Sequence, residues 1–200
     1  GSVWSRLGSN VTVIEYLDRI APGLDGELSS QFEKILKKQG INFILGSKVK
    51  STQKNSEGVE VHIENVSSSE SSSLQTEIVL VSTGRVPNTK GLFDESLGIK
   101  LTDKGFIKID KNYRTDVEGV WAIGDVIEGP MLAHKAEEEG VAVAELIKGK
   151  PGHVNYGIIP SVVYTNPEVA SVGMTEEDLK GKSISYKVGK FPFLANGRAK

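Results

Sequence analysis

The chain has 200 residues, a formal net charge of −2 and well-mixed charged residues, which suits one large domain or parts of two and argues against nucleic acid as the main partner. No apolar run approaches the length of a membrane span, so we expect no membrane partner. The sequence has no cysteine, which excludes disulfides, thiolate metal sites and a cysteine nucleophile within these residues, and we assign no metal ligand.

Both ends of the chain look like interruptions. Residues 1–8 resemble the later part of a helix closed by Gly8, and residues 191–200 stop in the middle of a pattern. We therefore expect the chain to be a piece of a longer protein, with a complete domain that has frayed ends as the alternative.

Residues 10–15 are expected to form a strand that ends in an acid, Glu15. A helix end, a glycine, a short strand and a terminal acid form the second half of a dinucleotide-binding βαβ unit, in which the acid accepts hydrogen bonds from the adenosine ribose. Because a carboxylate repels a 2′-phosphate, this pattern favours NAD over NADP. By itself a strand-final acid is weak evidence, since acids often end exposed strands.

A helix is predicted over residues 25–40, where apolar residues recur at helical spacing, namely Leu28, Phe32, Ile35 and Leu36. A strand follows over residues 41–45. The segment 46–49 leaves this strand toward the same side of the sheet. Val49 is therefore a candidate for apolar contact with an adenine ring, with core packing as the alternative.

Alternating polar and apolar residues over 58–64 and 74–80 predict a β-hairpin or meander. The serine-rich residues 67–73 between these strands are expected to form a flexible, solvated tip. A further alternating strand is predicted over residues 105–110.

The apolar run 78–81 predicts a fully buried strand that ends in Ser-Thr-Gly-Arg. Ligands bind outside the carboxyl ends of such strands, where Gly84 permits close approach of the backbone. Arg85 can pair with a phosphate or, as is commoner, with a neighbouring carboxylate.

The stretch 121–134 reads as a short buried strand, a sharp stop at Gly124-Asp125, a Gly-Pro turn and a helix start. An Asp in this position suits a large polar cofactor, because its carboxylate accepts hydrogen bonds from sugar-type hydroxyls. The helix N-terminus offers unpaired N–H groups and a positive dipole end. The alternative is a strand-to-helix turn of any α/β protein.

The helix after Pro130 carries a stripe of small or apolar residues that would let it pack close to a sheet or a cofactor: Ala133, Ala136, Gly140, Val143, Ala144 and Ile147. Its acidic run 137–139 is expected to be solvated. Beyond Gly157 the pattern changes to an antiparallel α+β section, with strands over 157–164, 169–173 and 186–193 and a capped helix start at Thr175.

These motifs together resemble the dihydrolipoyl dehydrogenase family, within the class I pyridine nucleotide–disulfide oxidoreductases. The resemblance covers the chain from end to end and is carried by residues 1–8, Glu15, 82–88, 122–126, 131–140, 153–156 and 159–168. It implies an α/β fold, a partial flavoprotein with two Rossmann-like dinucleotide-binding domains for FAD and NAD, followed by the start of an α+β dimerisation domain. The implied domains are residues 1–83, 84–156 and 157–200.

The resemblance also implies roles for individual residues. Asp125, after Gly124, would accept hydrogen bonds from the ribityl chain of FAD. The backbone of residues 131–134 would lie against the flavin, and these residues are Met131, Leu132, Ala133 and His134. The NAD-contacting positions of the family match Glu15, Val49 and Gly84.

By the same resemblance, the parent enzyme oxidises dihydrolipoamide on a lipoyl-carrying protein and reduces NAD, as a homodimer within a 2-oxo acid dehydrogenase complex. Its home would be the mitochondrial matrix or a bacterial cytoplasm. The family's redox cysteine pair, both glycine-rich loops and the catalytic His–Glu pair would lie outside the chain. We therefore assign no catalytic residue and expect the 200-residue piece to be inactive. Two alternatives are another FAD/NAD-dependent disulfide-type reductase and a non-enzymatic dinucleotide-binding or dimerisation module.

Overall fold

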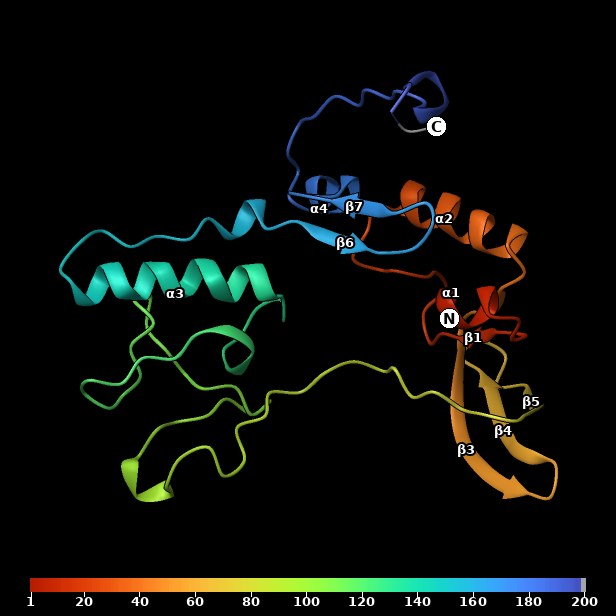
Figure 1. Cartoon of the computed structure of the whole chain (residues 1–200), viewed down its shortest axis with the longest axis horizontal. Coiled ribbons are helices and arrows are strands. Elements are labelled where there is room, and N and C mark those ends of the chain that lie inside the picture. The colour runs from red at the N-terminus through yellow and green to blue at the C-terminus, as the bar shows by residue number, and fades with distance from the viewer. Residues whose placement is uncertain (199–200) are drawn as a thin grey trace. The chain divides into compact units, whose positions relative to one another are not determined.

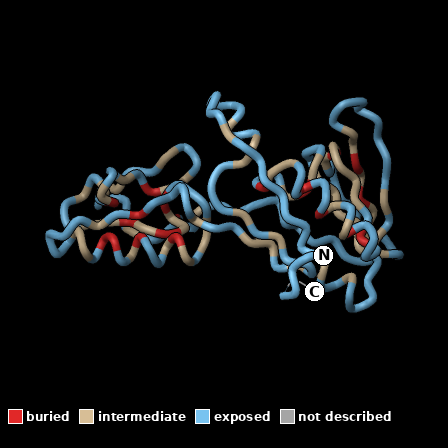
Figure 2. The backbone as a smooth tube through the Cα atoms, turned by 90° about the horizontal axis from the view of Figure 1, so that it is seen from above, coloured by how far each residue is buried: buried red, intermediate tan, exposed pale blue. Residues whose placement is uncertain are grey.

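The computed structural model describes residues 1–198 and separates into two compact units (Figure 1). The first unit comprises Gly1–Val79 together with the segment from Ser161 onward, and the second comprises Leu80–Pro160. Each unit has its own cluster of buried residues, which Figure 2 draws in red. The domain boundaries expected from the sequence stay a prediction.

A parallel βαβ arrangement opens the first unit. After the short helix α1 (Ser2–Arg6), strand β1 (Thr12–Ile14) pairs in parallel with β2 (Asn42–Ile44), and helix α2 (Gly26–Lys38) connects the two strands. The predicted helix and both predicted strands are confirmed with somewhat shorter bounds. This arrangement brings the carboxyl ends of β1 and β2 to the same edge.

The core of the first unit forms between α2 and these strands. Its buried residues are Ile20, Phe32, Leu36 and Ile41. The apolar spacing placed Leu28 on the inward face of the helix, and this was wrong, because its side chain is exposed. The adjacent Ser29 faces the core instead, where its hydroxyl donates a hydrogen bond of 2.5 Å to the carbonyl of Ile20 and so satisfies a buried polar group.

An antiparallel sheet follows in the order β3 (Ser47–Asn55), β4 (Gly58–Asn65) and β5 (Ser71–Thr76). The predicted hairpin is confirmed, although β3 was not expected and β5 begins earlier than predicted. Serines 71–73 belong to β5 and pair with β4, so they do not form the tip. Pairing with β4 outweighs the low strand preference of an all-serine segment on this edge strand.

The fully buried strand predicted at residues 78–81 is wrong. These residues form no strand, and the exposed fractions of Ile78, Leu80 and Val81 are 82%, 69% and 77%. A buried strand needs hydrogen-bonded neighbours on its edges and layers over its faces. Within residues 1–198 this segment has no paired strand. The predicted strands at 105–110 and 186–193 are absent for the same reason, apart from one isolated bridge between Leu101 and Ile107.

The second unit packs its loops against helix α3 (Ala133–Ile147). The strand expected before Gly124 is reduced to one isolated bridge between Arg114 and Trp121, although Ala122 is buried as predicted. Short 3₁₀ turns complete the unit, at Glu95–Leu97 (η1), Gly124–Val126 (η2) and Tyr156–Ile158 (η3). The buried apolar cluster consists of Ile107, Tyr113, Ala122, Ile127, Ala142, Val143 and Val154.

The face of α3 that is buried differs from the predicted stripe. The buried residues are Lys135, Glu139, Ala142 and Val143. Ala133, Ala144 and Ile147 of the predicted stripe are exposed, because the inward face of the helix is rotated away from them. Within the acidic run, Glu137 and Glu138 are exposed as expected, but Glu139 is completely buried, so the expectation of a solvated run was wrong there.

The segment from Ser161 onward joins the first unit. Strands β6 (Ser161–Val163) and β7 (Val169–Ser171) pair in antiparallel fashion, and Val163 and Val169 pack against the core beneath α2. Helix α4 (Glu176–Gly181) begins with the predicted cap, a reciprocal capping box at Thr175. A 3₁₀ turn, η4, follows at Phe193–Ala195. Across the described residues, no helix combines the length and hydropathy needed to cross a membrane.

Candidate functional site

The stop predicted after Ile123 is a tight turn at the start of η2. Gly124 has φ +74°, a left-handed conformation that favours glycine. A Cβ at this position would lie 3.3 Å from the Cβ of Ala136, so the turn rests closely on α3. The turn carries the carboxylate of Asp125, whose side chain is 41% exposed, at the surface of the second unit.

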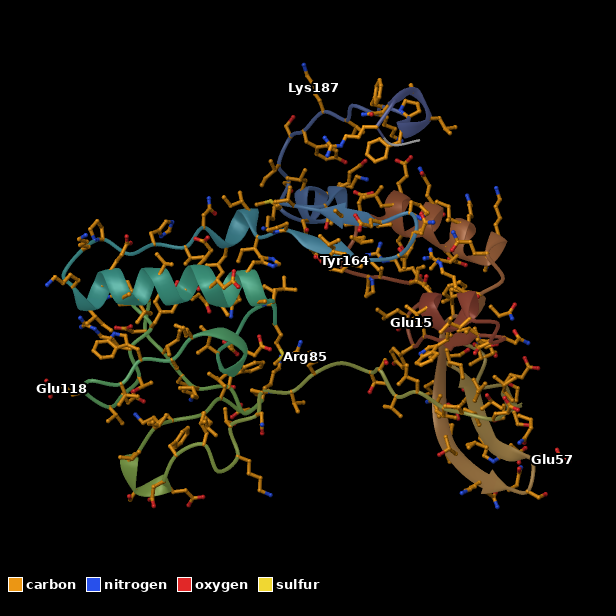
Figure 3. All side chains as sticks on the ribbon, in the orientation of Figure 1. Glu15, Glu57, Arg85, Glu118, Tyr164 and Lys187 are labelled. Carbon is orange, nitrogen blue, oxygen red and sulfur yellow. The ribbon has the colours of Figure 1, made fainter. Side chains whose placement is uncertain are left out.

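Arg85 pairs with this carboxylate. Its Nη2 lies 2.5 Å from Oδ2 of Asp125, and the two side chains are 66% and 41% exposed (Figure 3 labels Arg85). The structure thus favours the neighbouring carboxylate over a phosphate as the partner of Arg85. An ion pair this exposed contributes little stability, on the order of 0–1 kcal/mol. Its main effect is to orient one oxygen of Asp125.

Helix α3 begins beside this turn without a side-chain cap. Leu132 is its extended N-cap residue, no side chain of the described part caps it, and its first turn holds no acid. The ring of His134 is engaged elsewhere, because its Nε2 lies 2.8 Å from the carbonyl oxygen of Pro160. In the second unit, the η2 turn that contains Gly124 and Asp125 lies against α3, whose first residue is Ala133. An uncapped helix N-terminus suits a polar or anionic ligand atom.

A buried ion pair lies behind the turn. The side chains of Lys135 and Glu139 have no exposed surface, and Lys135 Nζ lies 3.2 Å from Oε1 of Glu139. Lys135 Nζ also donates to the carbonyl of Gly124 at 3.0 Å. The N–H of Gly124 donates to Oε2 of Glu139 at 2.7 Å. Both backbone hydrogen-bonding groups of Gly124 are therefore bound by this one pair.

Two tyrosines extend the network. The hydroxyl of Tyr156 donates to Oε1 of Glu139 at 2.7 Å, and the hydroxyl of Tyr113 lies 2.9 Å from that of Tyr156. Because Tyr156 has one hydrogen and gives it to the carboxylate, Tyr113 is the donor between the two hydroxyls. Desolvation of the partly buried hydroxyl, followed by the hydrogen bonds with Tyr113 and Glu139, raises the pKa of Tyr156 far above its ordinary value. Tyr156 therefore stays protonated as a donor.

Sequence reasoning missed this network. The signal that could have found it is spacing, since Lys135, Glu139, Ala142 and Val143 recur at i, i+4, i+7 and i+8 on one helical face. A Lys and a Glu at i and i+4 ordinarily indicate a solvated pair. Here they share their face with apolar core residues, which is the pattern of a buried pair.

The predicted NAD-contacting residues lie in different units. Glu15 directly follows β1, and its Oε1 accepts from the N–H of Leu17 at 2.9 Å (Figure 3 labels Glu15). Its carbonyl accepts from Ser47 at 3.0 Å, which ties it to the start of β3, the strand that carries the 47% exposed Val49. Gly84, with φ +119°, belongs to the second unit. Among residues 1–198, no cluster of His, Cys, Asp or Glu could hold a metal ion.

Comparison with known proteins establishes the class. The family model described as pyridine nucleotide-disulphide oxidoreductase matches residues 1–140. The model of that family's dimerisation domain matches residues 159–200. The chain belongs to the pyridine nucleotide-disulphide oxidoreductase family, and the expected fold class is confirmed.

The chain is similar over most or all of its length to individual dehydrogenases and to a flavoprotein disulfide reductase. Over its whole length the chain is 54% identical to dihydrolipoyl dehydrogenase 1, mitochondrial, of Arabidopsis thaliana and 56% identical to dihydrolipoyl dehydrogenase 3 of Pseudomonas putida. It covers 39% and 43% of those two proteins. A solved structure, the HOCl-induced flavoprotein disulfide reductase RclA of Escherichia coli, matches 98% of this chain and 44% of its own, with a TM-score of 0.86 at 28% identity. The chain thus spans about two fifths of each of these proteins.

Proposed function

We propose that this chain is part of an FAD- and NAD-dependent dihydrolipoyl dehydrogenase, which oxidises protein-bound dihydrolipoamide and reduces NAD. The observation that carries the proposal is the turn at Gly124-Asp125, which presents an exposed carboxylate beside the uncapped start of α3. The names of the relatives from Arabidopsis thaliana and Pseudomonas putida support the same activity.

The residues of the second unit fit FAD. Asp125 offers a carboxylate to the hydroxyls of a ribityl chain, and Gly124 keeps the backbone close to α3 without a side chain in the way. The backbone at Met131–His134 offers the positive end of the helix to an electron-rich ring edge. FAD, when bound, supplies the two-electron chemistry, while this chain's residues bind and orient it.

The first unit supplies the proposed NAD contacts. Glu15 stands at the carboxyl end of β1, at the edge where α/β sheets bind nucleotides, and its carboxylate suits the two hydroxyls of an adenosine ribose. Val49 offers an exposed apolar side chain for an adenine ring. Gly84, which belongs to the second unit, stays a prediction as an NAD-contacting position.

The remaining parts of the proposal concern the whole protein. A dithiol relay and an acid–base pair would come from outside these residues, since the chain has no cysteine and none of its residues is assigned a catalytic role. The match to the dimerisation-domain model supports a homodimer. Assembly into a 2-oxo acid dehydrogenase complex follows from the proposed activity. The relatives support either the mitochondrial matrix or a bacterial cytoplasm.

The test compares the complete polypeptide with the isolated chain. We expect the complete polypeptide to purify with a flavin absorption spectrum and to form NADH from dihydrolipoamide and NAD. We expect the isolated 200-residue chain to show no such turnover. NADH formation by the isolated chain would contradict the absence of catalytic residues.

The likeness to RclA favours one rival, a disulfide reductase with a different electron acceptor. That rival predicts a flavin spectrum and NADH oxidation with another disulfide, but no reaction with lipoamide. A complete polypeptide with neither flavin nor redox activity would instead leave a dinucleotide-binding or dimerisation module.

A further inference from the structure

We propose that Lys135, Glu139 and Tyr156 are positioning residues that fix the Gly124 peptide groups and thereby set the Asp125 carboxylate for the hydroxyl chain of a flavin before the cofactor binds. This inference rests on the proposed function, because it concerns the same cofactor seat. None of the three residues is assigned a contact with the cofactor.

The hydrogen-bonding polarity of the Lys135–Glu139 pair matches that of the Gly124 backbone. Lysine only donates hydrogen bonds and an ionised carboxylate only accepts them. The carbonyl of Gly124 meets the lysine at 3.0 Å, and its N–H meets the carboxylate at 2.7 Å. If the peptide unit on either side of Gly124 were turned around, a donor would face Lys135 or an acceptor would face Glu139. The ion pair therefore specifies one conformation of the residue that precedes Asp125.

The side chain of Lys135 also lies against a second glycine turn. Gly129, with φ +121°, lies so close that a Cβ there would be 3.2 Å from Cε of Lys135. The left-handed turns at Gly124 and Gly129 thus both lie against this one buried side chain. Val126, the residue after Asp125, is held as well, because its carbonyl accepts from the N–H of Ile107 at 2.8 Å. The segment that carries Asp125 is therefore held from several sides.

The buried Lys135–Glu139 pair holds the turn at a cost in stability. Burying two charges is expensive, and apolar residues of similar size often give equal or greater stability. Such residues would nevertheless leave the N–H of Gly124 without its partner, and the carbonyl of Gly124 with only the N–H of Ile127, 3.3 Å away. Within residues 1–198, no buried side-chain polar atom lacks a hydrogen-bond partner, so the network is complete as it stands. The pair is therefore better explained by the fixed orientation that it gives to the turn than by a gain in stability.

The experiment uses the complete polypeptide with its flavin removed and then titrated back. The variants are Glu139→Gln, Glu139→Leu with Lys135→Met, and Tyr156→Phe. The matched control is Glu138→Gln, which changes an exposed acid one residue away on the same helix. Two quantities are measured for each protein, the melting temperature of the apoprotein and the dissociation constant of FAD. The visible circular dichroism of the bound flavin reports its orientation.

We expect the double variant to keep an apoprotein melting temperature close to that of the wild type but to bind FAD about tenfold or more weakly, the effect of losing one to two net hydrogen bonds. Glu139→Gln keeps an acceptor for the Gly124 N–H, so its affinity should fall less. Glu138→Gln should change neither quantity. If the double variant fails to fold, Tyr156→Phe carries the test, because it keeps both charges and should weaken FAD binding by a few-fold.

A coupling measurement tests the route through Asp125. If the pair acts by setting this carboxylate, Glu139→Gln should weaken FAD binding by a smaller factor in the Asp125→Ala protein than in the wild type. Unchanged FAD affinity in the folded variants, or fully additive effects with Asp125→Ala, would overturn the inference while leaving the proposed function intact. A wild-type polypeptide that binds no flavin would instead overturn the proposed function itself.

Discussion

At the scale of single residues, two ion pairs of the second unit differ in what surrounds them. Arg85 and Asp125 lie at the surface, where water screens the charges and long side chains lose entropy on pairing. Lys135 and Glu139 are fully buried, and each also binds a backbone group of Gly124. The two pairs therefore differ in effect. The exposed Arg85–Asp125 pair orients a carboxylate only loosely, whereas the buried Lys135–Glu139 pair fixes the turn at Gly124.

This contrast predicts unequal costs of removing one partner. Lys135→Met should lower the free energy of unfolding by about 3–5 kcal/mol, because it leaves the Glu139 charge buried without its cation. Arg85→Met should change it by less than about 1 kcal/mol. Urea denaturation of the two variants beside the wild type measures both values. Similar small effects for both would contradict the burial of the Lys135–Glu139 pair.

At the scale of helices and strands, the N-termini of α2 and α4 share one carboxylate. Oδ1 of Asp25 accepts from the N–H of Glu27 at 3.0 Å, and Oδ2 accepts from the N–H of Glu176 at 3.0 Å. In the opposite direction, Oε1 of Glu177 on α4 accepts from the N–H of Gly26 on α2 at 3.1 Å. The segment from Ser161 onward is thus attached to α2 by reciprocal capping as well as by apolar packing.

The shared cap predicts a pH-dependent contribution to stability. The hydrogen bond from Glu176, and then that from Glu27, lower the pKa of Asp25 from its ordinary value of 3.8. A lowered folded-state pKa means that the contribution is complete at neutral pH and is lost as the pH falls below about 4. Asp25→Ala should therefore cost about 1–2 kcal/mol at pH 7, as expected for the loss of helix caps, and progressively less in acid.

The measurement is urea denaturation of the wild type and of Asp25→Ala across this pH range. Asp18→Ala is the control, because it removes an exposed carboxylate of the same unit that caps no described helix. A difference between wild type and Asp25→Ala that stays constant down to pH 3 would contradict the ionised double cap.

The elements that could be predicted from sequence are those specified locally. Helix α2 has its apolar spacing and its cap at Asp25, α4 has its capping box, and the hairpin that contains β4 has its alternation. The site was predictable in part, because Gly124 and Asp125 stand at an abrupt stop between apolar residues and a helix. The buried role of Glu139 was not, since whether an acid on a helix faces water depends on which side the chain packs against. The strand at residues 78–81 failed for a related reason, because pairing is a property of two segments.

At the scale of the whole molecule, the chain consists of two units, and the polypeptide passes from the first to the second between Val79 and Leu80. The apolar side chains of the segment 78–81 are exposed at this crossing. Exposed apolar runs of this kind ordinarily mark a surface that another part of a protein covers. If the chain is part of a longer flavoprotein, as proposed, a parallel sheet completed by further strands is the natural cover, since four consecutive apolar residues fit a strand buried on both faces.

Hydrogen exchange tests this expectation in two settings. In the isolated chain, the amides of residues 78–81 should exchange without protection, because they lie in no ladder, whereas those of Val61 and Ile63 in β4 should be protected by pairing on both sides. In the complete polypeptide, the same four amides should become protected as the sheet is completed. Rapid exchange in both settings would mean that the apolar run is a strand in neither, and protection in the isolated chain would contradict the unpaired conformation of this segment.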